Sequence, residues 1–270
     1  MDGTIFISYT IPMIGFLIKK TFFDVWDNLF RVALVNLGFI LSMGAFVFLY
    51  SVSAELSPVV SLVVLAVGIL WGCVYLSTAA GSLKAVSDYS SFGFADFFRN
   101  LKEFWPAGIA SGVIIFVAVI LVTYVLPFYL SMQSLFGLLL AAVVFWTLVV
   151  FALSFQFFFA IRSRLDVKLG KILKKCFLIF FDNPGLCIFS MIYCLVQLVF
   201  SVLLAFLFPG PAGILLYLDE ALRLRLLKYD WLEANPDADR RKIPWDALLI
   251  DEREKTGTRS LRNFIFPWKD

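Results

Sequence analysis

Two adjacent carboxylates are the residues of this chain best suited to chemistry. Asp219 and Glu220 follow the apolar run 211–218, and Arg223 comes shortly after them. A carboxylate at membrane depth is costly and by default indicates an ion or substrate path. The structural alternative is neutralisation within one helix, because Arg223 lies four residues after Asp219 and three after Glu220.

The sequence lacks the residues that most classes of enzyme need. The chain has no histidine, which removes the commonest general base and metal ligand. It has no Gly-rich phosphate loop, G-x-S-x-G elbow or G-x-G-x-x-G fingerprint. Its cysteines lie in apolar or amphipathic segments without a C-x-x-C pair, which is typical of packing residues rather than of a disulfide or zinc site. We therefore expect a protein that is not an enzyme, with no catalytic residue, metal or cofactor.

The composition predicts an all-α membrane bundle. Of 270 residues, 61% are hydrophobic, against about 45–50% in soluble domains. Several charge-free stretches reach the roughly 20 residues that a membrane helix needs. The five clear spans are residues 32–50, 58–82, 108–130, 135–161 and 185–208. A short sixth, residues 211–228, contains Asp219 and Glu220.

The distribution of basic residues predicts the orientation. Lys and Arg lie before the first span, between the second and third, and between the fourth and fifth, whereas residues 51–57 and 131–134 contain none. Basic residues accumulate in short cytoplasmic loops. The N-terminus is therefore expected in the cytoplasm, and the basic C-terminal segment favours a sixth crossing that returns the chain to the cytoplasmic side.

Amphipathic segments precede the first, third and fifth spans, which suggests a threefold internal arrangement. In the second of them, residues 94–105, an apolar stripe contains Phe97, Phe98 and Trp105. Such helices lie at the headgroup boundary with their apolar face toward the lipid. The alternative is that they are cytoplasmic extensions packed on one another. Single polar residues within the spans, such as Asn36, are expected to bond between helices.

We divide the chain into a bundle, residues 1–230, and a charged, proline-containing cytoplasmic tail, residues 231–270. The tail has aromatic islands at 245–250 and 264–268. Basic residues beside aromatics suit docking on a membrane or a protein partner, or packing under the chain's own inner face. Acidic residues are interspersed, which argues against nucleic-acid binding. The terminal contact candidates are Arg259, Arg262, Phe264, Phe266 and Trp268.

The segment Ala95–Trp105, together with Asn36 and the small residues Thr78-Ala79-Ala80, resembles the YesL-like family of bacterial membrane proteins. The resemblance covers roughly the first 125 residues, and the proline-rich tail departs from the compact ending of that family. It implies an inner-membrane protein associated with carbohydrate uptake systems. It implies an accessory role and supplies no catalytic residue.

These observations lead to two functional hypotheses. The first is a non-enzymatic accessory or scaffold protein of the bacterial cytoplasmic membrane, whose partners are the lipid bilayer and a membrane protein engaged from the cytoplasmic side. The alternative is a small-solute or lipid transporter in which Asp219 and Glu220 line a path between repeat units. The transporter hypothesis predicts a water-accessible cavity beside these carboxylates.

Overall fold

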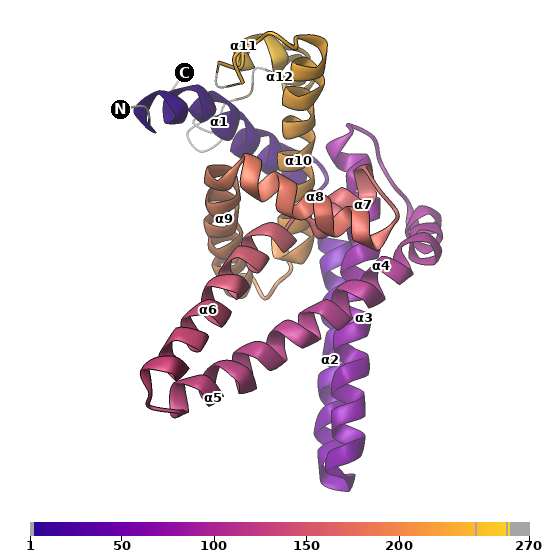
Figure 1. Ribbon diagram of the computed structural model, residues 1–270. Coiled ribbons are helices and arrows are strands. Elements are labelled where there is room, and N and C mark those ends of the chain that lie inside the picture. Colours follow the sequence, from indigo (N-terminus) through magenta and orange to yellow (C-terminus); the bar gives the residue numbers. More distant parts are fainter. Residues whose placement is uncertain (1–2, 241, 258, 260–270) are drawn as a thin grey trace.

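A computed structural model describes residues 3–240, 242–257 and 259 as helices joined by short connections (Figure 1). Five of the described helical stretches are long and apolar enough to cross a membrane, as the sequence predicted. They are Leu29–Leu56, Pro58–Ser87, Phe94–Ser131, Leu135–Arg164 and Pro184–Leu203.

The first two spans form a hairpin of α2 (Leu29–Leu56) and α3 (Pro58–Ser87). Only Ser57 separates them, and its hydroxyl accepts a hydrogen bond from the N–H of Val59 at 3.3 Å. Pro58 stands at the first position of α3, where its missing N–H costs no helical hydrogen bond. A serine cap followed by proline therefore begins α3 immediately after α2 ends.

The third span differs from the expected arrangement. The predicted inner-surface helix over residues 94–105 is not a separate element, because α4 (Phe94–Ile120) runs through it into the span. Pro106 lies inside α4 and removes one main-chain hydrogen bond. A π-helical turn, Leu121–Val125, and α5 (Leu126–Ser131) complete the span.

Small residues bring α4 close to α3. A Cβ atom at Gly108 would overlap the main chain of Val74, and one at Gly112 would lie 2.9 Å from a methyl group of Leu70. This is the close approach that a small-xxx-small pattern permits in membranes. The extended contact with α3 stabilises α4 as one helix despite its proline.

The remaining spans are α6 (Leu135–Phe155), which continues into α7 (Phe158–Arg164), and α9 (Pro184–Leu203). The amphipathic helix α8 (Leu169–Asp182) joins them. The predicted sixth segment becomes α10 (Gly210–Ala234), which is not among the five apolar helices because charged residues begin at Asp219. Figure 1 shows the α2–α3 hairpin extending well beyond the turn between α9 and α10.

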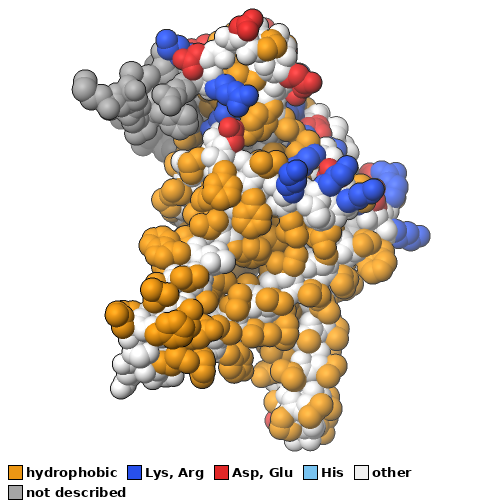
Figure 2. Space-filling view, viewed as in Figure 1, with side chains coloured by type: hydrophobic (Ala, Val, Ile, Leu, Met, Phe, Trp, Pro, Cys, Tyr) orange, Lys and Arg blue, Asp and Glu red, His pale blue; other side chains and the backbone are white. Residues whose placement is uncertain are grey.

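We call the end of the molecule opposite the tip of the α2–α3 hairpin the inner end. It is formed by α1 (Gly3–Asp27), α8, the second half of α10, α11 (Trp245–Leu248) and α12 (Ile250–Thr256). Most charged side chains on the visible face gather there and at the start of α4, and hydrophobic ones predominate over the rest of that face (Figure 2). Trp245 and Leu249 are buried in a core shared with α1, α7, α9 and α10. The first aromatic island of the tail thus packs against the chain itself.

Candidate functional site

The two predicted carboxylates lie on adjacent positions of α10 and are 1% and 0% exposed. Asp219 contacts α7, where the Nε of Arg164 donates to its Oδ1 at 2.9 Å and a second guanidinium nitrogen donates to its Oδ2. The hydroxyl of Ser163 donates to the same Oδ1 at 3.2 Å. Asp219 is therefore fully engaged by one bidentate arginine and one serine.

Glu220 contacts α1 instead. The ammonium group of Lys20 lies 3.5 Å from its Oε1, and the hydroxyl of Thr21 donates to its Oε2. The same ammonium donates to Asp24 and, at 3.2 Å, to the carbonyl of Ser87. Glu220 thus shares one buried cation with a second carboxylate.

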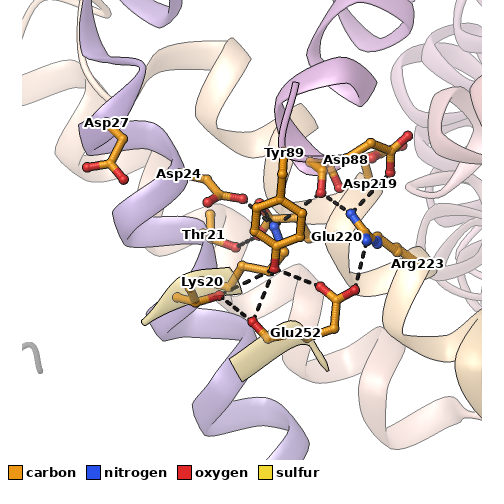
Figure 3. Close-up of polar contacts among 12 residues, drawn as sticks. Lys20, Thr21, Asp24, Asp27, Asp88, Tyr89, Asp219, Glu220, Arg223 and Glu252 are labelled. Atoms are coloured by element: carbon orange, nitrogen blue, oxygen red, sulfur yellow. Dashed lines mark hydrogen bonds and ion pairs between the residues drawn. The ribbon is translucent and has the colours of Figure 1, made fainter. Parts of the chain in front are cut away.

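Arg223 bonds to the end of α3 and to α12. It donates to the carbonyl of Ser87, to Asp88 Oδ1 at 3.1 Å and to Glu252 Oε1 at 2.7 Å. The structural alternative, that α10 neutralises itself through Arg223, is wrong, because Asp219 and Glu220 each face a neighbouring helix. Figure 3 shows Lys20 of α1, Arg223 of α10 and Glu252 of α12 pointing toward one another around Tyr89.

Tyr89 lies at the centre of this inner-end network. Its ring is 4.1 Å from the ammonium of Lys20, and its hydroxyl donates to Glu252 Oε2 at 2.8 Å. Burial raises the pKa of Tyr89 to about 12, so the phenol stays neutral and remains a donor. We define the inner-end network as Lys20, Thr21, Asp24, Ser87, Asp88, Tyr89, Arg164, Asp219, Glu220, Arg223 and Glu252.

A second polar cluster joins α8 to α10 and was not predicted. Lys228 lies 3.1 Å from Asp182, whose carboxylate also accepts from the hydroxyl of Tyr229 at 2.8 Å. Asn183 donates to the same hydroxyl at 2.8 Å. The sequence feature that could have indicated this cluster is the Asp182-Asn183 pair, because the same Asp-Asn pair occurs at Asp27-Asn28. In both places the Asp ends an amphipathic helix and the Asn precedes a span.

The predicted contact residues of α4 differ in exposure. Phe97 is half-buried and lies 5.4 Å from the ring of Tyr75, whereas Phe98 and Trp105 are 61% and 52% exposed. Arg259 pairs with Asp27 through two hydrogen bonds of 2.8 Å. The other terminal candidates lie outside the described residues: Arg262, Phe264, Phe266 and Trp268.

Two cavities lie beside the α3–α4 connection. The larger, of about 520 Å³, is an apolar groove between α2, α3 and α4. The smaller, of about 280 Å³, has a polar lining that includes Lys84, Asp88 and Arg99. Neither is lined by Asp219 or Glu220. Within the described residues, no His, Cys, Asp and Glu side chains group in a way that could hold a metal ion.

The long apolar helices decide the class of the protein. In the most apolar stretch of each of these five helices, no more than 28% is buried within the chain. Most of that apolar surface therefore needs an apolar solvent. The chain is a multi-pass α-helical membrane protein. Comparison with protein-family models, curated proteins and solved structures finds no match. The resemblance to the YesL-like family stays a prediction for this membrane protein.

Proposed function

We propose that this membrane protein is a non-enzymatic accessory or scaffold protein of the bacterial cytoplasmic membrane, with its inner end in the cytoplasm and in contact with a second membrane protein. The closed inner-end network is the observation that supports this function most directly. Its charged groups bind one another across five elements, α1, α3, α7, α10 and α12, together with the residues that follow α3.

A transport path would need carboxylates that face a water-filled space. Asp219 instead accepts from Arg164 and Ser163, and Glu220 contacts Lys20 and Thr21. Neither of the two cavities beside the α3–α4 connection is lined by these carboxylates. Such a network suits a rigid platform, because moving any one element would leave a buried charge without its partner. The geometry therefore favours the scaffold hypothesis over the transporter hypothesis.

The first turns of α4 provide the contact surface of the proposed scaffold. Phe98 and Trp105 point outward, and the exposed basic residues Arg99 and Lys102 lie between them. Exposed aromatic residues beside arginine are typical of protein interfaces. They also suit a lipid headgroup boundary, so the experiment must separate a protein partner from lipid.

Photo-crosslinking in intact membranes distinguishes a protein partner from lipid. We would place p-benzoylphenylalanine at position 105 and, as a lipid-facing control, at position 139, where Leu139 is 58% exposed on α6. The expected result is one discrete protein adduct from position 105 and none from position 139. Trp105→Ala should reduce co-purification of that same protein in mild detergent, whereas Lys174→Ala on α8 should not.

The proposal is overturned if position 105 crosslinks only lipid and the chain is recovered alone. It is also overturned if Trp105→Ala and Lys174→Ala recover the adduct protein equally well. An association of the crosslinked protein with carbohydrate uptake would extend the proposal in the direction that the YesL-like resemblance implies.

A further inference from the structure

The apolar groove beside α4 has the dimensions of a ligand site. Its volume of about 520 Å³ falls within the range of about 300–1,000 Å³ for small-molecule pockets. Its walls come from three elements that pack together at the inner part of the bundle. The residues that the argument uses are Arg31, Leu34 and Gly38 of α2, Trp71 and Tyr75 of α3, and Phe97 of α4.

The groove has a charged end and an apolar end. Arg31 lies two residues after the start of α2, near the inner end, and Gly38 lies seven residues farther along the helix. Seven residues correspond to about 10 Å of helix. Leu34 and Trp71 line the stretch toward the apolar end. This order, a cation at the interface and apolar side chains at depth, matches the order of groups in a phospholipid.

Arg31 places a positive charge in the wall of the groove. Its side chain is half-buried and donates to the Oδ1 of Asn28 at 2.9 Å. Among the contacts of the described residues, it pairs with no carboxylate, whereas Arg164 and Arg223 each pair with acidic groups. A guanidinium binds phosphate oxygens through parallel N–H donors. A headgroup with a net negative charge would therefore neutralise the charge of Arg31, with which no carboxylate of the described residues pairs.

The wall of the groove is formed before any ligand enters. The hydroxyl of Tyr75 donates to the carbonyl of Val35 at 2.8 Å, which holds α3 against α2. The ring of Phe97 lies 5.4 Å from that of Tyr75. A Cβ atom at Gly38 would overlap the Tyr75 hydroxyl, so glycine permits this contact. A fixed wall reduces the ordering cost of binding.

We propose that this groove binds one anionic phospholipid, with its phosphate on Arg31 and one acyl chain between Leu34, Trp71 and Phe97. Trp105, the residue at which the protein contact is tested, does not line the groove, although Phe98 of the same contact surface does. One basic residue near an anionic surface gives a preference of about fivefold for anionic over zwitterionic lipid.

Fluorescence quenching of Trp71 tests the site. The full chain would be reconstituted in phosphatidylcholine vesicles that contain increasing small fractions of either phosphatidylglycerol or phosphatidylcholine brominated on its acyl chains. The contribution of Trp71 is the difference between the wild-type chain and Trp71→Phe. We expect the brominated phosphatidylglycerol to quench Trp71 at about fivefold lower mole fraction than the brominated phosphatidylcholine.

Substitutions at Arg31 assign the preference to the groove. Arg31→Gln should remove it, and Arg31→Lys should retain most of it. Lys174→Gln makes the same charge change on the exposed surface of α8, outside the groove, and should leave the preference unchanged. Equal quenching by the two lipids, an unchanged preference in Arg31→Gln, or no quenching of Trp71 would each overturn the proposal. The crosslink at position 105 should persist in Arg31→Gln, so the two proposals fail separately.

Discussion

Asn36 of α2 donates a hydrogen bond from its Nδ2 to the carbonyl of Pro209 at 2.8 Å, in the turn between α9 and α10. Its Oδ1 also accepts from the N–H of Ala212 at 2.9 Å. From Asn36 to the end of α2 at Leu56 there are 20 residues, or about 30 Å of helix. The turn is thus held far from the tip of the α2–α3 hairpin.

Asn36→Leu should lower the free energy of unfolding by about 2 kcal/mol, because it leaves the turn's buried main-chain groups without partners. Reversible unfolding in mixed detergent, followed by tryptophan fluorescence, measures the change. Thr123→Val is the control, since the Thr123 hydroxyl donates only within its own helix, to the Val119 carbonyl. Equal effects of both substitutions would show that Asn36 does not hold the turn.

The depth of the α9–α10 turn is measurable by cysteine labelling of cells. The sequence favoured a full sixth crossing, whereas the position of Asn36 leads us to predict that α9 and α10 form a re-entrant pair. We expect a membrane-impermeant maleimide to modify Leu56→Cys and Met132→Cys from outside and to leave Leu207→Cys unmodified. The wild-type chain, with its own cysteines, is the control. External labelling at position 207 would instead support the sixth crossing.

Arg164→Gln should destabilise the chain by about 3–5 kcal/mol, because it leaves the buried Asp219 carboxylate without its cation. Asp219→Asn in the same chain should recover most of this loss, since it removes the unpaired charge. The four chains of this double-mutant cycle are compared by unfolding in detergent. Additive losses would mean that the two side chains act independently.

Gly108→Ala should cost about 1–3 kcal/mol, because the added methyl group would overlap the main chain of Val74 and push α4 away from α3. Gly44→Ala is the matched control in another span, where a Cβ atom would meet no heavy atom within 4 Å. It should be neutral or stabilising by up to about 1 kcal/mol. Thermal stability in detergent distinguishes the two, and similar values would contradict the close α3–α4 contact.

Trp245→Ala should lower the free energy of unfolding by about 3–5 kcal/mol, because the ring is buried in the inner-end core. Ile250→Ala removes an exposed side chain from the same tail and should change stability by about 0.5 kcal/mol or less. The comparison, again by unfolding in detergent, tests whether the tail is part of the fold. If Trp245→Ala left the free energy of unfolding unchanged, the tail would not be part of the fold.

The sequence alone determined the five apolar helices, because a chain segment in lipid must satisfy its main-chain hydrogen bonds internally and needs about 20 apolar residues to cross. Both requirements are local, so the charge-free runs could be read directly. Local spacing also predicted that Asp219 would pair with Arg223, and there it failed. The i, i+4 spacing does bring Lys20 to Asp24 in α1, but Asp219 pairs with Arg164 of α7, which no spacing within α10 could reveal.

Only the tertiary structure decided which polar groups meet, at the inner end and at the turn between α9 and α10. Thr21 and Glu220 are 199 positions apart, and Asn36 and Ala212 are 176 apart. No periodicity in the sequence links such pairs. They form because burial removes water, so each carboxylate or main-chain group must bond to whatever the packing of α1, α2, α7 and α12 around α10 brings within reach.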